Sequence, residues 1–408
     1  MRPYANKLRL NRRSLLAGLT GAAVTAQTSA AQDGLMPWMQ TLGDGDLPYG
    51  LPGPRVANVV RRPAADSPGF EIWHTPLEHL RGTITPNGLH FAVHHNGIPD
   101  IDPAAHRLVI HGMVARPLSF DLNSLARYPL VTRTAFIECA GNSATNAVSP
   151  WARDMTLGDV SGQISAAEWT GIPLRILFDE AGIDPAATWV IAEGADGGRH
   201  MRSLPLRPLV AEGMLALYQN GEPLRPSQGY PMRILMPGWE GNAQIKWLHR
   251  LELADRPAWS KDESGLYADP LANGKLRMMS LAMSVKSVIT APSGQQVIAP
   301  GPRQIEGLAW SGRGRIARVE LSIDDGRTWT EARLQAPVQP KALTRFSLPW
   351  DWHNERAILM SRATDETGDM QPTRDIWHDT FAGHSFNHFN AIQAWSINRS
   401  GEVKNHYA

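Results

Sequence analysis

The chain contains a single cysteine, Cys139, among its 408 residues. A disulfide within the chain is therefore excluded, and so are metal sites that need several cysteines. The fold must be held by packed apolar cores, for which 42% apolar and 19% charged residues are ample. A chain of this length predicts two or three domains. The thiol has three open roles: an inert core residue, a bridge to another chain, or a chemical function.

The N-terminus has the features of an export signal. Residues 8 to 33, LRLNRRSLLAGLTGAAVTAQTSAAQD, combine Arg12 and Arg13 with an apolar run from Leu15 and small residues at Ala30 and Ala31. The run is too short to span a bilayer as a helix. An ordinary secretory signal is the alternative, but Asn-Arg-Arg-Ser-Leu-Leu favours a twin-arginine signal over residues 1–31. We therefore expect a periplasmic protein that folds, and takes up any cofactor, before export.

The next segment and the charge pattern narrow the class further. Residues 32–70 are rich in Pro and Gly without sustained periodicity, which predicts an irregular lead-in. The net charge is only +1, with both signs interspersed, so no basic face suits a nucleic acid backbone. We expect neither a nucleic acid partner nor a membrane span.

Residues 71–277 predict a mixed α+β domain. Short apolar runs bounded by turn residues, HRLVIHG (106 to 112), TWVIAEG (188 to 194) and PMRILMPG (231 to 238), are typical of strands. Two stretches favour helices: SFDLNSLARY, with Asp121 or Ser119 as a cap, and PLRILFDEAGI, which Gly182 would end.

Residues 278–382 change in texture and predict an antiparallel sandwich. Apolar and polar side chains alternate in short runs between Pro-Ser-Gly and Asp-Asp-Gly turns. In ARVELSI, the residues Val319, Leu321 and Ile323 should share one face. About a hundred residues suit an immunoglobulin-like fold. The tail, 383–408, is rich in His and Asn and shows no strong pattern.

An ordered set of motifs resembles the sulfite oxidase family of molybdopterin enzymes. FIECAGN (136 to 142) is followed by EWTGIPL, EGADGG, SQGYPMRILMPG and IKWL, and then by the alternating C-terminal domain. The resemblance implies an α+β molybdopterin-binding catalytic domain followed by an immunoglobulin-like dimerisation domain. It also implies a molybdenum-molybdopterin cofactor, with the thiolate of Cys139 as the metal ligand. A soft anionic sulfur suits a redox-active metal, and a buried apolar thiol is the alternative.

Further site residues come from the same resemblance. Tyr267 matches the active-site tyrosine, and His95, beside His94 in FAVHHNG, matches a pterin-contacting histidine. Gln228 stands where many relatives have histidine. The implied cofactor-binding set is His94, His95, Cys139, Asp196, Gln228, Arg233 and Lys246, with Cys139 and Tyr267 as catalytic residues. For these positions, solvated or packed side chains and surface ion pairs are the alternatives.

The chain departs from the family where a substrate anion would bind. Animal members line this pocket with arginines, whereas Val93, Ala144 and Thr380 occupy the corresponding positions here. A dianion would bind poorly in a cleft without cations, unless Arg153 or nearby histidines compensate. The departure favours the bacterial branch that contains the molybdenum subunit of the Sox sulfane dehydrogenase, whose substrate is a sulfane sulfur on a carrier protein.

This resemblance implies an oxidoreductase that adds oxygen to a sulfur compound. The chain has no Cys-x-x-Cys-His motif for haem, so a c-type cytochrome is expected as electron acceptor, with a homodimer or hetero-oligomer as assembly. A sulfite dehydrogenase acting on free sulfite is the alternative. A zinc hydrolase is disfavoured because HTPLEH (74 to 79) lacks the required spacing and contains Pro76. A non-enzymatic binding module, or a methionine sulfoxide reductase subunit, would leave either the cysteine motif or the sandwich unexplained.

Overall fold

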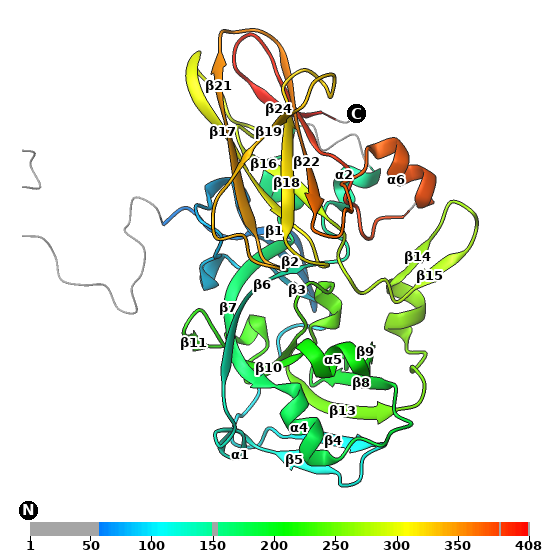
Figure 1. The fold of residues 1–408 in the computed structure, drawn as a ribbon. Helices are drawn as coiled ribbons and strands as arrows, with labels where there is room; N and C mark the ends of the chain where they lie inside the picture. The colour runs from blue at the N-terminus through cyan, green and yellow to red at the C-terminus, as the bar shows by residue number, and fades with distance from the viewer. Residues whose placement is uncertain (1–56, 149–153, 383–384, 407–408) are drawn as a thin grey trace, which may run out of the picture. The chain divides into compact units, whose positions relative to one another are not determined.

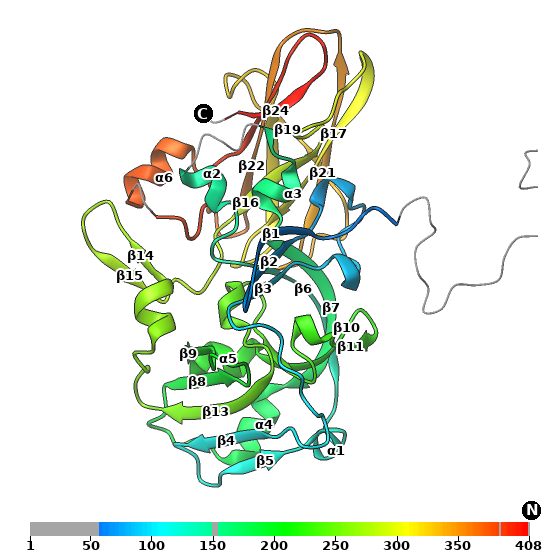
Figure 2. The ribbon, with the colours of Figure 1, turned by 180° about the vertical axis from the view of Figure 1, so that it is seen from behind.

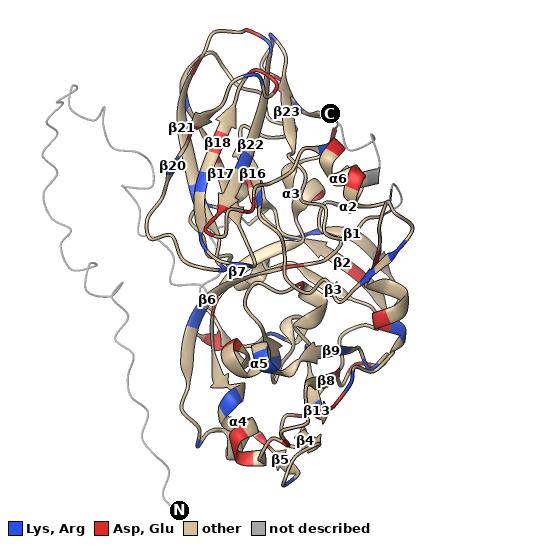
Figure 3. Cartoon of the chain, turned by 45° about the vertical axis from the view of Figure 1, so that its right-hand side comes forward, with Lys and Arg blue, Asp and Glu red and all other residues tan. Residues whose placement is uncertain are grey.

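The computed structural model describes residues 57–148, 154–382 and 385–406. The expected signal at 1–31, most of the lead-in, and Arg153 therefore lie outside the described residues. Residues from Asn58 onward form one compact unit. Within the described part, no helix is long and apolar enough to cross a membrane. Lys and Arg are interspersed with Asp and Glu in both halves of this unit (Figure 3).

The first domain is built on two mainly antiparallel sheets (Figure 1). One sheet has the order β11-β10-β7-β6, and β12 also pairs with β10. The other has the order β5-β4-β13-β8-β9, in which only the β13 and β4 pair is parallel. Their strands are β4 (Leu108–Gly112), β5 (Leu118–Phe120), β6 (Val131–Glu138), β7 (Ile164–Pro173), β8 (Trp189–Gly194), β9 (Met201–Pro205), β10 (Met214–Gln219), β11 (Glu222–Pro223), β12 (Arg233–Leu235) and β13 (Leu248–Ala254). The three strands expected from apolar runs, β4, β8 and β12, are confirmed.

Local sequence sets both expected helices. α1 (Leu122–Leu125) begins at Asp121, whose side chain accepts from Ser124 N–H in a capping box. α4 (Leu174–Ala181) buries Leu174, Leu177 and Phe178 and ends at Gly182, which has a left-handed φ of 73°. α4 and α5 (Leu206–Glu212) contribute to the apolar core beside the second sheet. Short helices α2 (Ala144–Val148) and α3 (Leu157–Ser161) follow the cysteine motif.

Two smaller sheets complete this part of the unit. β1 (Arg62–Ser67), β2 (Phe70–His74) and β3 (Ala92–His94) pair in order (Figure 2), so the end of the lead-in is a strand and not irregular as expected. β14 (Ala268–Pro270) and β15 (Leu276–Met278) form a hairpin. HTPLEH contains only a single 3-10 turn at Leu77–His79, so its polar residues do not share a helix as a zinc motif requires.

The C-terminal sandwich is confirmed, and its sheets have the orders β16-β17-β21-β20 and β19-β18-β22-β23-β24. Their strands are β16 (Lys286–Ala291), β17 (Gly301–Trp310), β18 (Ile316–Ser322), β19 (Thr330–Glu331), β20 (Arg333–Leu334), β21 (Thr344–Trp352), β22 (Ala357–Asp365), β23 (Ala394–Ile397) and β24 (Val403–His406). Val319 and Leu321 are buried in the sandwich. Ile323 is 39% exposed, because β18 ends one residue before it.

The tail differs most from expectation. Beyond α6 (Arg374–Thr380) it supplies β23 and β24, which extend the sheet next to β22 (Figure 1). Its alternation is short, which is why no pattern stood out in the sequence. The backbone N–H of His388, in the same tail, donates to Ala140 O at 2.8 Å. The tail therefore touches the cysteine motif.

β6 joins two apolar cores. Side chains alternate across a strand, so Phe136 packs into the core shared with the sandwich, whereas Ala135 and Ile137 pack into a second core around Trp169. The same alternation sends Cys139 to the side of Ile137 and Glu138 to the side of Phe136. The chain thus presents its thiol on the face away from the sandwich.

Candidate functional site

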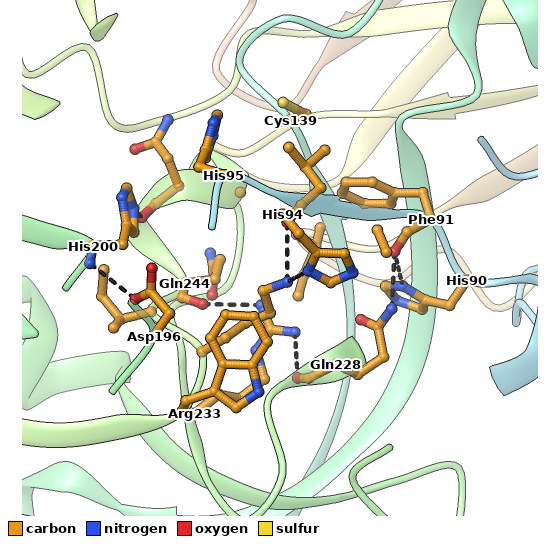
Figure 4. A pocket seen from close by; sticks show the side chains of 18 of the residues that line it. His90, Phe91, His94, His95, Cys139, Asp196, His200, Gln228, Arg233 and Gln244 are labelled. Atoms are coloured by element: carbon orange, nitrogen blue, oxygen red, sulfur yellow. Dashed lines mark hydrogen bonds between the residues drawn. The ribbon is translucent and has the colours of Figure 1, made fainter. Parts of the chain in front are cut away.

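Cys139 follows the last residue of β6 and lines a cavity in the first domain (Figure 4). Burial raises the pKa of its thiol to about 11, although a hydrogen bond from Gly141 N–H opposes this and the charges of Glu240 and Glu138 add to it. The thiol is therefore protonated near neutral pH unless a cation takes its place beside the sulfur. Gly241 packs against it, since a Cβ there would lie 3.1 Å from Glu138 O and 3.4 Å from Cys139 Cα.

Two cations line the cavity wall. Arg233, on β12, is 3% exposed and donates to Gln228 O and Gln244 O, each at 3.0 Å. Lys246 Nζ donates to Val93 O at 3.0 Å, Ser227 O at 3.2 Å and His94 Nδ1 at 2.8 Å. All of these acceptors are neutral. Figure 4 places Arg233 and Gln228 at the opposite end of the cavity from Cys139.

Arg233 and Lys246 are two groups of like charge, and burial makes the charged form of each less favourable. Burial lowers the pKa of Arg233 to about 9. Burial, followed by the charge of Arg233, also lowers the pKa of Lys246 well below its ordinary value, and Asp196 offsets this only in part. A bound anion would relieve both effects, because an opposite charge favours the charged form. This end of the cavity is therefore suited to an anionic group.

Aromatic and imidazole side chains surround the end near Cys139. Tyr267 Oη lies 3.4 Å from His95 Nε2, and the His95 ring stacks on His200 at 6.3 Å between centroids. Burial raises the pKa of Tyr267 strongly, with the charges of Cys139 and Glu240 adding to it, so its hydroxyl keeps its proton. Burial lowers the pKa of His95, and that of His94 to about 3, so both rings are neutral near pH 7.

A buried ionic cluster packs against the ring of Tyr267. Arg202, fully buried on β9, lies with its guanidinium 4.8 Å from the centre of the Tyr267 ring. It donates to Glu240 and Glu263, each at 3.0 Å. His388 of the tail lies 3.2 Å from the other oxygen of Glu240. The tyrosine ring is thus held by charges that do not themselves line the cavity.

Asp196 and Gln228 position backbone as well as lining the cavity. Asp196 accepts from His200 N–H at 2.9 Å and Gly198 N–H at 3.3 Å, which shapes the loop after β8. Gln228 ends a 3-10 turn at Pro226–Gln228, and its Nε2 donates to Phe91 O at 2.9 Å. Both residues are buried: Gln228 is 2% exposed and Asp196 is 5% exposed.

The structure brings all the site residues that the sequence indicated to one cavity. They are His94, His95, Cys139, Asp196, Gln228, Arg233, Lys246 and Tyr267. Of the three positions expected to replace arginines, Val93 lines the cavity, whereas Ala144 and Thr380 are not among its lining residues. The expected place of Ala144 and Thr380 beside a substrate anion therefore stays a prediction.

Sequence reasoning missed other lining residues, chiefly His90, His200, Asn242 and Gln244. His200 stands four residues after Asp196, and Asn242 and Gln244 precede Lys246, so proximity to known motifs was their only signal. His90 Nε2 and Asn242 Oδ1 are buried and have no hydrogen-bond partner among the described residues. Such groups cost stability unless a ligand satisfies them.

Comparisons with known proteins agree with this cavity. A model described as oxidoreductase molybdopterin binding domain matches residues 95–261. A second, described as Mo-co oxidoreductase dimerisation domain, matches residues 277–393. The crystal structure of the sulfane dehydrogenase SoxCD from Paracoccus pantotrophus is similar with a TM-score of 0.88 and 40% identity, covering 93% of this chain and 99% of that chain.

Curated relatives have the same character. Sulfite oxidase from Gallus gallus is 31% identical over 330 residues, which cover 72% of this chain and 70% of the chicken protein. Mitochondrial sulfite oxidase from Mus musculus is 30% identical over 357 residues, or 80% of this chain. The NAD(P)H nitrate reductase from Hordeum vulgare is 32% identical over 346 residues, or 74% of this chain. The chain spans 65% of the mouse protein and 38% of the barley protein.

Proposed function

Since the chain belongs to the sulfite oxidase family of molybdopterin-binding oxidoreductases, we propose that it oxidises a sulfur compound, with sulfane sulfur on a carrier protein as its preferred substrate. The family implies a molybdenum-molybdopterin cofactor. The single observation that favours the carrier-bound substrate is that, among the described residues, no Arg or Lys side chain lines the cavity next to Cys139. Free sulfite as substrate is the second candidate.

The residues present fit this cofactor. Cys139 would hold the molybdenum through its thiolate, which the metal's charge would stabilise against the raised pKa. Arg233 and Lys246 would hold the anionic part, because their present acceptors are all neutral. The buried unpartnered atoms His90 Nε2 and Asn242 Oδ1 leave hydrogen-bonding capacity for a polar ligand.

The bound cofactor supplies a two-electron redox centre for adding oxygen from water to sulfur. The balance for a persulfide is R–S–S⁻ + H2O → R–S–SO⁻ + 2H⁺ + 2e⁻. Tyr267 keeps its proton and can donate a hydrogen bond to the reacting group. His95 is neutral and lies within 3.4 Å of the Tyr267 hydroxyl, so it can accept a released proton.

The surroundings of Cys139 favour an uncharged attachment over a free dianion. Near Cys139 the described wall carries Val93 and His95, and burial lowers the pKa of His95. Of the two described lining cations, Arg233 lies beside Gln228, and Lys246 is already bonded to Val93 O and His94. Three exposed apolar side chains lie on segments next to the lining residues His95 and Tyr267: Phe70, Leu266 and Phe386, at 38%, 46% and 49% exposure. The Phe70 ring packs against His95 in a tilted arrangement, with 5.6 Å between centroids, and Asn387, next to Phe386, donates to Leu266 O. We call these three residues the apolar rim. A protein-borne substrate could bury this rim, whereas sulfite could not.

Partners and location are part of the same proposal. The single cysteine leaves no haem attachment motif in the chain, so we propose a separate c-type cytochrome as electron acceptor. The match to a dimerisation domain supports a homodimer or hetero-oligomer. The twin-arginine pattern at Arg12 and Arg13 supports a periplasmic location.

Steady-state turnover with purified, molybdenum-loaded protein tests the substrate. We expect kcat/KM for carrier-bound sulfane to exceed that for free sulfite. Replacing Phe386 by Asp should lower kcat/KM for the carrier substrate and leave kcat for sulfite nearly unchanged, because Phe386 is exposed and is not among the lining residues of the cavity. High affinity for sulfite with no turnover of any sulfur carrier would refute the preference and leave the family assignment standing.

Free sulfite remains the second candidate because His95 lines the Cys139 end of the cavity and would supply positive charge when protonated. Burial lowers the pKa of His95 below its ordinary 6.5. Sulfite turnover that depended on His95 would therefore fall as pH rises through a value below 6.5. A pH profile of kcat/KM for sulfite distinguishes the two candidates, since the carrier substrate needs no such protonation.

A further inference from the structure

His90 is a buried histidine on the cavity wall that the motifs did not single out. It lies between a 3-10 turn, Asn87–Leu89, and β3, and it is 1% exposed. Its ring stacks on Phe91 at 5.6 Å and meets Trp169 edge-on at 5.7 Å. Figure 4 shows His90 beside Gln228, away from Cys139. The packing fixes the ring in one orientation.

One ring nitrogen of His90 is satisfied and the other is not. Nδ1 lies 3.2 Å from Phe91 O, which also accepts from Gln228 Nε2 at 2.9 Å. A carbonyl oxygen requires a donor, so Nδ1 carries the proton and Nε2 presents a lone pair. Nε2 is buried and has no partner among the described residues. A buried acceptor of this kind is costly until a donor reaches it.

The surroundings keep His90 neutral. Burial lowers its pKa to about 3, and the charges of Arg233, Arg61 and Lys246 act in the same direction. A neutral ring with a free lone pair repels phosphate oxygens, which are acceptors themselves, and attracts N–H donors. A pterin ring system carries such N–H and amino donors, whereas Arg233 and Lys246 suit its anionic attachment.

We propose that His90 Nε2 accepts a hydrogen bond from an N–H group of the pterin and is a cofactor-binding residue of this chain. The inference depends on the cofactor of the family and not on which sulfur compound is oxidised. Many relatives have histidine at position 228, where this chain has Gln228. Here the imidazole at this end of the cavity comes from His90, and the amide of Gln228 donates to Phe91 O instead.

The test replaces His90 by Phe, which keeps the ring and removes both nitrogens. Phe91 O retains its bond from Gln228, so the apoprotein, from a host that makes no molybdopterin, should be as stable as wild type or more stable. The loaded protein should release cofactor about tenfold faster on dilution, equivalent to about 1.4 kcal/mol. Molybdenum content and the fluorescence of released, oxidised pterin measure this loss without any activity assay.

Two further variants make the result decisive. His90→Gln can present an acceptor oxygen and should restore part of the retention. His106→Phe is the matched control, because His106 is also buried, at 8% exposure, but its Nε2 already bonds Leu248 O at 2.9 Å. It should destabilise apoprotein and loaded protein alike. Wild-type retention in His90→Phe, or equal destabilisation of both its forms, would overturn the proposal.

Discussion

Replacing Lys286 by Met should weaken the junction between the sandwich and the cysteine motif. Lys286, on β16, is 3% exposed and donates to Glu138 Oε1 at 3.2 Å and Ser143 Oγ at 2.9 Å. Glu138, 1% exposed, immediately precedes Cys139 and also accepts from Asn142 and from Trp310 Nε1. Burial lowers the pKa of Lys286, and Glu138 opposes this. Methionine fills a similar volume but leaves the Glu138 charge buried.

The magnitude follows from the remaining partners. Removing one member of a buried ion pair typically costs about 3–5 kcal/mol, because the other charge is left uncompensated. Glu138 keeps two hydrogen bonds, from Asn142 at 2.9 Å and Trp310 at 2.7 Å. We therefore expect a loss of about 3 kcal/mol in the free energy of unfolding, at the lower end of that range. Adding Glu138→Gln removes the stranded charge and should recover most of the loss.

The assays use urea unfolding and the reactivity of the thiol. Because Cys139 is the only cysteine in the chain, any thiol reagent reports on this residue alone. Lys286→Met apoprotein should react faster than wild type, and the double variant should return toward the wild-type rate. A loss below about 1 kcal/mol, the scale of an exposed pair, together with an unchanged thiol rate would refute the reasoning.

Three other changes have defined outcomes. Cys139→Ser replaces a soft thiolate by a hard hydroxyl, so molybdenum content and turnover should collapse while circular dichroism is unchanged; full activity would remove the central assignment. For His388, burial lowers the pKa, but the hydrogen bond and charge of Glu240 outweigh it and raise the pKa above 6.5. Its stabilisation is complete below about 6.5 and is lost as pH rises through the raised value, so His388→Gln should flatten unfolding free energy measured across that window, and an unchanged slope would contradict the ion pair. Replacing Arg12 and Arg13 by Lys should leave precursor in the cytoplasm, as cell fractionation would show; normal periplasmic yield would indicate an ordinary secretory signal.

Local patterns predicted much of the fold. The capping residue Asp121, the helix stop at Gly182 and the alternation of Val319 with Leu321 are short-range signals, and each has the expected place in the structure. The motif series also brought the expected site residues to one cavity. Alternation on β6 could further have placed Cys139 and Glu138 on opposite faces.

What the sequence could not provide depends on contacts between distant segments. His90 faces Gln228 and Trp169, and His388 faces Glu240, only because strands far apart in the chain pack together. The tail was too short in pattern for β23 and β24 to be recognised, since their pairing with β22 supplies the order. His90 and His388 belong to no sequence motif, so only their contacts with distant segments indicate what they do.

The contact between His388 N–H and Ala140 O has a consequence for biosynthesis. A ribosome makes Ala140 before it makes His388, which lies 248 residues later (388 − 140) in the chain. The motif loop cannot acquire this hydrogen bond, nor Glu240 its His388 partner, until residue 388 has emerged from the ribosome. Cofactor capture that requires the finished loop therefore cannot begin on a nascent chain that still lacks this tail.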